Sequence, residues 1–152
     1  MAGAVVRIGA ADFEPGAELR SLSERTEGAG GLGCFIGIVR GEAAGRPIAA
    51  MTLEHYPGMT ERAVRAIAEE AQNRWHLLGT TVIHRVGRLT PGERIVLVMA
   101  AALHRGPALE ATSFLIDWLK TKAPFWKKEH FTDGAEAWVA ARASDEAAAT
   151  RW

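Results

Sequence analysis

Two pairs of β-rich segments, each followed by a helical segment, limit the folds open to this chain. The pairs are residues 34–40 with 48–55, and residues 80–86 with 94–103. The polar loop 41–46 joins the first pair as in a hairpin, and Pro91-Gly92 suits the centre of a type II turn within the second. This order predicts an α+β fold with mostly antiparallel strands and three main helices.

The three helices are predicted from apolar spacing and from proline. Residues 15–25 carry Pro15 in their first turn. Residues 60–75 repeat apolar side chains at spacings of three and four. A third helix should begin at Pro107 and bury Leu109, Ile116 and Leu119.

Shorter elements are predicted near both ends of the chain. Residues 3–9 alternate weakly and 137–140 are apolar, so both read as short strands. Ser144 looks like the N-cap of a last helix, because Asp145 and Glu146 follow it as an acidic first turn.

Four lysines and three large aromatic residues crowd around Pro124 in residues 118–129. Because Pro124 lacks a backbone donor and disfavours helical geometry before it, the third helix must end near Lys122. Lys120 then closes that helix, and Lys127 belongs to the next segment.

Two interpretations of these lysines need no catalysis. They can be solvated side chains at a helix C-terminus, where positive charge complements the dipole. Alternatively, Phe125 and Trp126 can stack bases as part of a lysine/aromatic module that binds single-stranded nucleic acid or an acidic protein partner.

Composition excludes several classes of protein. The 152 residues are 48% hydrophobic, which predicts one domain spanning residues 1–152. Eighteen basic residues balance eighteen acidic ones, so no global field attracts nucleic acid or an anionic membrane. Arg7 interrupts the N-terminal apolar run too early for a signal peptide, and no apolar stretch reaches the roughly 20 residues of a membrane span. We expect a cytoplasmic protein.

Three further motifs predict little chemistry. Residues 28–33 match the glycine pattern of dinucleotide-binding loops, but a helix precedes them and a strand follows, so a flexible turn is expected. The single cysteine, Cys34, lies in an apolar run and is expected to be buried and uninvolved in catalysis. The histidines lack metal-ligand spacing, so neither a metal site nor a cofactor is predicted.

Two basic positions lie where strands end. His104-Arg105 falls between a strand and a helix start, where anions find backbone donors, although an ordinary polar turn explains it equally well. Arg40 ends an apolar strand and is either a surface cap or an anion-binding fork. The residues by themselves leave both alternatives open.

Several unusual strings follow one another over residues 33–152. They are Phe35-x-Gly37-x-Val39-Arg40, Leu53-Glu-His-Tyr-Pro-Gly-Met59, Arg74-Trp75, Val82-Ile-His-Arg-Val-Gly87, Pro91-Gly92, His104-Arg105, Lys120-x-Lys-Ala-Pro-Phe-Trp-Lys127 and Arg151-Trp152. Together they resemble the large-subunit (MoaE) family of molybdopterin synthase. The resemblance implies an α/β hammerhead fold and a homodimer at the centre of a heterotetramer.

In that family a ubiquitin-like small subunit docks at each end of the dimer. The resemblance therefore implies a sulfurtransferase that takes sulfur from the thiocarboxylate on the partner's Gly-Gly tail. The acceptor is cyclic pyranopterin monophosphate, and the product carries the dithiolene of molybdopterin. No sulfur-bearing cysteine is needed in the large subunit, in agreement with an uninvolved Cys34.

The resemblance also assigns site residues. It implies catalytic Lys120 and Lys127, and a substrate-binding set of Ile38, Val39, Arg40, His104, Arg105, Lys120, Lys127, Lys128 and Glu129, with Phe35 and Arg142 as possible lining. We expect Lys120 to act as proton donor and acceptor at the acyl or pterin carbon, and Lys127 to orient the donor or stabilise developing negative charge.

The chain departs from the family pattern at two places. Gly41 stands where asparagine is frequent, before a short loop at 42–47. Gly106-Pro107 replaces a serine-rich step.

Overall fold

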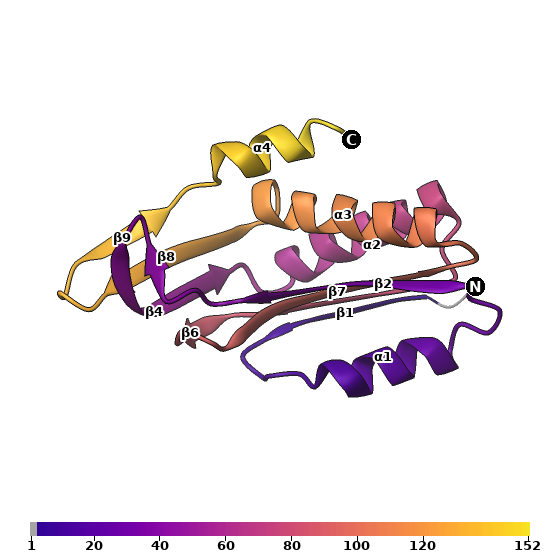
Figure 1. Cartoon of the computed structure of the whole chain (residues 1–152), viewed down its shortest axis with the longest axis horizontal. Helices are drawn as coiled ribbons and strands as arrows, with labels where there is room; N and C mark the ends of the chain where they lie inside the picture. The colour runs from indigo at the N-terminus through magenta and orange to yellow at the C-terminus, as the bar shows by residue number, and fades with distance from the viewer. Residues whose placement is uncertain (1–2) are drawn as a thin grey trace.

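The computed structural model describes residues 3–152, which form two sheets and the helices that cover them (Figure 1). The strands are β1 (Ala4–Gly9), β2 (Gly31–Ile38), β3 (Glu42–Ala43), β4 (Arg46–His55), β5 (Gly79–Arg85), β6 (Gly87–Leu89), β7 (Arg94–Ala102), β8 (Phe125–Phe131) and β9 (Glu136–Val139). The helices are α1 (Pro15–Glu24), α2 (Met59–Trp75), α3 (Arg105–Thr121) and α4 (Ala143–Ala149). Most strand pairs are antiparallel and three of these helices are long, so the predicted α+β class is confirmed.

The first sheet has the order β1-β5-β7-β2 and is covered on both faces. Figure 1 shows α1 on one face, with α2 and α3 on the other. Val82 and Val98 pack in the cluster under α2 and α3, whereas Ile83, Leu97 and Met99 pack with Leu22 of α1. Burial on both faces explains why these central strands read as continuous apolar runs.

The predicted hairpin between residues 34–40 and 48–55 is wrong. Strand β2 pairs with β7, and β4 pairs with β8 and β6, so the two predicted partners belong to different sheets. Apolar alternation marks a strand but does not encode its neighbour, which is decided by packing between distant segments. Only a short hairpin forms there: β3 and β4 meet around Ala44 and Gly45, whose φ angles of 49° and 79° fit a type I′ turn.

Other predictions from the sequence are confirmed. Strands β5 and β7 are antiparallel, β1 and β9 exist, and α1 begins at Pro15. The Pro91-Gly92 turn has its expected geometry, because Gly92 has φ of 92° and the Glu93 amide donates to the Thr90 carbonyl at 3.1 Å.

Three local predictions are wrong. Leu109 is 58% exposed, because it lies on the face of α3 that points away from the sheet. Ser144 lies inside α4, whose N-cap is Arg142. Cys34 is exposed, because β2 is an edge strand of its sheet.

The glycine pattern at residues 28–33 serves packing more than flexibility. A Cβ on Gly30 would lie 2.0 Å from the Leu103 carbonyl oxygen, and one on Gly33 would lie 2.4 Å from that of Ala108. Glycine is required here because β2 runs directly against the start of α3.

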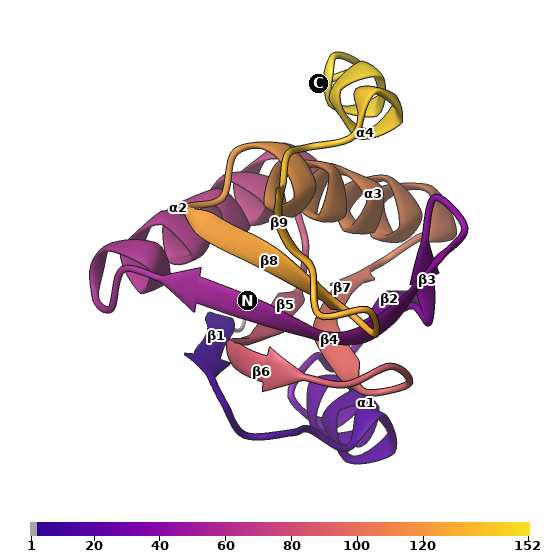
Figure 2. The same ribbon diagram turned by 90° about the vertical axis from the view of Figure 1, so that its left-hand side faces the viewer.

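Helix α3 ends where Pro124 predicts. Its C-cap is Lys122, whose amide donates to the Trp118 carbonyl at 2.8 Å. The hydroxyl of Thr60, at the start of α2, donates to the Pro124 carbonyl at 3.3 Å. In Figure 2, β8 leaves this connection and crosses beside β4, so Lys120 and Lys127 lie on two different elements.

Candidate active site

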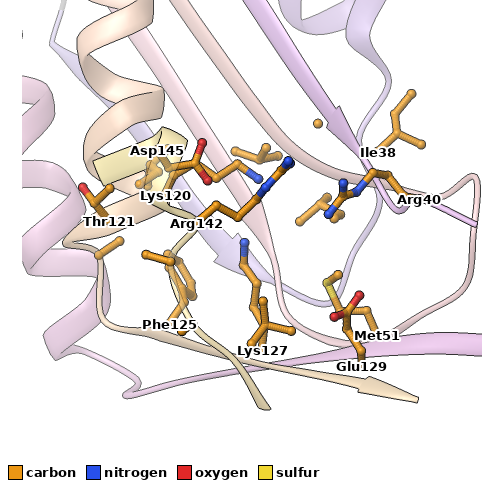
Figure 3. A pocket seen from close by; sticks show the side chains of 18 of the residues that line it. Ile38, Arg40, Met51, Lys120, Thr121, Phe125, Lys127, Glu129, Arg142 and Asp145 are labelled. Carbon is orange, nitrogen blue, oxygen red and sulfur yellow. The ribbon is translucent and has the colours of Figure 1, made fainter. Parts of the chain in front are cut away.

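A cavity of about 390 Å³ opens where the C-terminal end of α3 meets β2, β8 and the segment before α4 (Figure 3). It is lined by Phe35, Ile36, Gly37, Ile38, Arg40, Met51, Ile95, Val96, Leu119, Lys120, Thr121, Ala123, Phe125, Lys127, Glu129, Val139, Ala140, Ala141, Arg142 and Asp145. Apolar side chains form much of the wall, and charged groups reach in from four separate segments. This is the usual composition of a small-molecule site.

Strand β8 supplies three cavity residues through simple alternation. Phe125, Lys127 and Glu129 all line the cavity, as expected for side chains two residues apart on one face of a strand. Lys128 points away from the cavity, where its amine lies 3.3 Å from Glu136 and 4.6 Å from the centre of the Trp138 ring. The cavity therefore receives Lys127 and Glu129 but not Lys128.

Lys127 has the most perturbed amine of the cavity. Burial lowers its pKa from 10.5 to about 8, and the adjacent positive charge of Lys120 contributes further. Asp145 acts in the opposite direction, and Arg40 adds to the lowering. An amine with such a pKa can both hold and release a proton near neutral pH.

A neutral histidine, His84, lies behind Phe125 in the wall of the cavity. His84 is buried and stacks on Phe125 with ring centroids 3.9 Å apart. Burial, with the charges of Lys127 and Lys120, lowers its pKa to about 3. Its Nδ1 lies 2.8 Å from the Arg85 carbonyl oxygen and donates to it, which fixes the orientation of the ring.

The cavity carries an excess of positive charge. Among residues 3–152, its lining includes four cationic side chains, Arg40, Lys120, Lys127 and Arg142, against the two carboxylates of Glu129 and Asp145. Figure 3 shows Lys120, Arg142 and Asp145 on one side of the cavity, with Lys127 and Arg40 approaching from other elements. Such an arrangement suits an anionic ligand.

The structure brings together most of the residues expected at the site. Ile38, Arg40, Lys120, Lys127 and Glu129 line one cavity, as do the less certain Phe35 and Arg142. Val39 does not, because its side chain is 2% exposed and packs in the core. Its amide and carbonyl are both bonded to the 92–93 turn.

His104 and Arg105 lie at the other end of α3. His104 is the N-cap of that helix and Lys120 lies in its last turn, so about 22 Å of helix separates Arg105 from Lys120. Both residues are exposed. Within one chain they do not reach the cavity.

Sequence reasoning missed Asp145 and the inward position of Phe125. The acidic first turn of α4 was visible, but nothing in the sequence places that turn beside Lys127. Strand alternation was the available signal for Phe125, since it lies two residues before Lys127. The same alternation argues against the lysine/aromatic module in which Phe125 and Trp126 would stack bases together. Trp126 points away from Phe125 and packs edge-on against Tyr56, with ring centroids 4.7 Å apart.

Residues 3–152 hold neither a cluster of metal-ligating side chains nor a helix suited to a membrane. No group of three or more His, Cys, Asp or Glu side chains in this part of the chain is placed to hold a metal ion. Likewise, none of the helices within it is long and apolar enough to cross a membrane.

Comparisons with known proteins agree on one family. Two similar relatives, both molybdopterin synthase catalytic subunits, come from Cereibacter sphaeroides and Escherichia coli. The first is 53% identical over 97% of this chain and 99% of its own length, and the second is 49% identical over the full length of both. A solved structure, the molybdopterin biosynthesis MoaE protein from Burkholderia ambifaria, is 49% identical with a TM-score of 0.83, covering 98% of this chain and 97% of that one. The family model described as MoaE protein matches residues 8–122, and the chain therefore belongs to the MoaE protein family.

Proposed function

We propose that this protein is the catalytic subunit of molybdopterin synthase and works as a sulfurtransferase. It would move two sulfurs in turn, one from the C-terminal thiocarboxylate of each of two ubiquitin-like small subunits, to cyclic pyranopterin monophosphate, forming the dithiolene and leaving two small subunits with carboxylate ends. The observation that carries the proposal is the pairing of Lys120 and Lys127 in one positive cavity, where the pKa of Lys127 is lowered to about 8. Relatives that are 49–53% identical and named molybdopterin synthase catalytic subunit support it.

The charge of the cavity suits the two reactants. The acceptor carries a cyclic phosphate and the donor ends in an anionic thiocarboxylate, so two negative groups must approach each other. Arg40 and Arg142 reach the cavity from β2 and α4 and can bind phosphate oxygens, at roughly 1.5–3 kcal/mol for each charge-assisted hydrogen bond. Lys120 offsets the charge on the donor at the reacting carbon.

We assign proton transfer to Lys127 and not, as expected from the sequence, to Lys120, because the lowered pKa of Lys127 suits it to this role. With a pKa of about 8, roughly a quarter of this amine is neutral at pH 7.5, so it can accept a proton and return it within one cycle. Lys120, whose positive charge helps to lower that pKa, stays at the acyl or pterin carbon. The phenyl ring of Phe125 and the neutral His84 behind it keep water from one side of the amine.

A homodimer would complete the site. Because His104 and Arg105 are exposed about 22 Å along α3 from the cavity, they can bind substrate there only if a second copy presents them. The exposed Leu103 and Leu109 beside them are apolar surface of the kind that such a contact covers. We therefore propose that each site combines the cavity of one copy with His104 and Arg105 of the other.

The test is a reaction of cyclic pyranopterin monophosphate with an excess of thiocarboxylated small subunit, because each acceptor consumes two thiocarboxylates, assayed for dithiolene product. Lys120→Ala and Lys127→Ala should each lower product formation by about 10²-fold or more, whereas Lys122→Ala, at the exposed C-cap of α3, should not. Normal product formation by Lys120→Ala would refute its role.

The shared site has its own test. Lys120→Ala and Arg105→Ala chains are mixed and allowed to exchange subunits. Recovery of roughly a quarter of wild-type sites is expected, because half of the dimers are mixed and each contains one intact site. No recovery after proven exchange would show that a single copy supplies both residues.

A further inference from the structure

Helix α4 has little to hold it in place by itself. It is seven residues long, none of its residues is buried, and it packs along α3 (Figure 1). A helix this short is unstable in isolation, so its position depends on what anchors its ends.

The anchor at the C-terminal end is Asp117, on α3. Its Oδ2 accepts hydrogen bonds from Arg151 Nη2 at 2.8 Å and from Trp152 Nε1 at 2.7 Å. The Asp117 side chain is only 14% exposed. The indole of Trp152 also packs edge-on against Trp75 and Phe114, at 5.5 and 5.7 Å between ring centroids.

The other end of α4 forms a wall of the cavity. Residues 139–142 lead into the helix and line the cavity together with Asp145. In Figure 3, Arg142 and Asp145 lie beside Lys120 and close to Lys127. Residues 139–145 therefore reduce the exposure of the Lys127 amine. The carboxylate of Asp145 opposes the lowering of the Lys127 pKa that this burial causes.

We propose that Asp117 is a positioning residue for the cavity: by holding Arg151 and Trp152 it keeps α4 in place, so that residues 140–145, beyond the β8–β9 ladder, cover the Lys127 amine. Asp117 does not touch the cavity. The effect of Asp117 on catalysis rests on the proposed function, because Asp117 matters for turnover only if Lys127 exchanges a proton in the cavity. The coverage itself is a property of the free chain and is tested without substrate.

The readout is the pKa of Lys127, measured by pH-dependent acetylation of the intact chain and mass spectrometry. The charged or titratable groups that face Lys127 are Arg40, His84, Lys120, Glu129, Arg142 and Asp145. Releasing the segment removes burial, which is the largest cause of the low pKa, so the midpoint should rise from about 8 toward 10.5. Removing only the Asp145 charge, in Asp145→Asn, should shift it in the opposite direction, below 8.

Asp117→Ala and a chain shortened after Thr150 should therefore both raise the midpoint. The shortened chain keeps Asp117 and decides the question if Asp117→Ala does not fold. Glu110→Ala is the matched control, because Glu110 accepts an indole hydrogen bond from Trp75 at 2.9 Å on the same helix and does not line the cavity. A midpoint that stays at 8 in folded Asp117→Ala or in the shortened chain, or that falls as in Asp145→Asn, would overturn the proposal.

Discussion

Lys127 should make the folded protein less stable at neutral pH. Its pKa is about 8 in the folded chain and 10.5 when unperturbed. That difference of 2.5 corresponds to at most about 3 kcal/mol, at 1.36 kcal/mol for each pKa unit. The charged amine is the disfavoured form in the folded state, so folding bears this cost whenever the amine is protonated.

The pH window follows from the sign of the shift. Below about pH 8 both states hold the proton and the full cost is present. Between about 8 and 10.5 the unfolded chain binds more protons than the folded one, so stability rises with pH. Above 10.5 the amine is neutral in both states and the cost disappears.

Lys127→Met leaves an unbranched side chain that is one atom shorter and removes the charge. At pH 7 it should raise the midpoint of urea unfolding by about 1–2 M, taking roughly 3 kcal/mol over a slope of about 2 kcal/mol/M. Its advantage over the wild type should shrink as pH rises from 8 to 10.5. Lys122→Met, on the same segment but exposed, should show neither effect.

Urea titrations of the three proteins at half-unit pH steps check this reasoning. Comparing variant with wild type cancels the titration of the groups that do not interact with Lys127. A Lys127→Met protein that is less stable than the wild type at pH 7 would refute the reasoning. So would an advantage that is the same at pH 7 and pH 10.5.

Three further predictions concern backbone and buried charge. Ala44→Asn should stabilise the β3–β4 turn by about 0.5–1 kcal/mol, read as a higher melting temperature, because Ala44 has a φ of 49° that asparagine tolerates better; no gain would contradict the turn. Gly33→Ala should cost at least about 2 kcal/mol in urea unfolding, since its Cβ would lie 2.4 Å from the Ala108 carbonyl oxygen, whereas Gly41→Ala has open space and should be neutral. Arg85→Met should cost about 3 kcal/mol by the same measurement, because the buried guanidinium donates to the carbonyls of residues 10 and 94 and pairs with Glu93 at 3.3 Å; a neutral result would show that these bonds add nothing.

The sequence predicted the positions of helices and strands better than it predicted which strands pair with each other. Helix α3 ends at Thr121, with Lys122 as its C-cap, as Pro124 predicted. The prediction succeeds because the missing amide of proline and the clash of its ring act within a few residues. The first hairpin failed for the opposite reason. Its two strands are each correctly placed, but β2 is held by β7 and β4 by β8, both far along the chain.

In the candidate site, too, local patterns place some residues and long-range packing places the others. Strand alternation from Lys127 is sufficient to place Phe125 and Glu129 on its side and Lys128 on the other. No local pattern brings Asp145 to the cavity, because that requires α4 to return along α3 and to be anchored at Asp117. The separation of Arg105 from Lys120, by contrast, already follows from the helix predicted between Pro107 and Lys122, because such a helix holds its two ends far apart.

The sequence by itself determined the class of fold, the break at Pro124, the family and the two lysines expected at the candidate site. These depend on backbone chemistry and side-chain order, which act over a few residues. The tertiary structure decided which strands pair, which of the basic residues share a cavity, and that the pKa of Lys127 is lowered. Those outcomes depend on burial and on the distance between charges, and both are set by segments that meet only when the whole chain is folded.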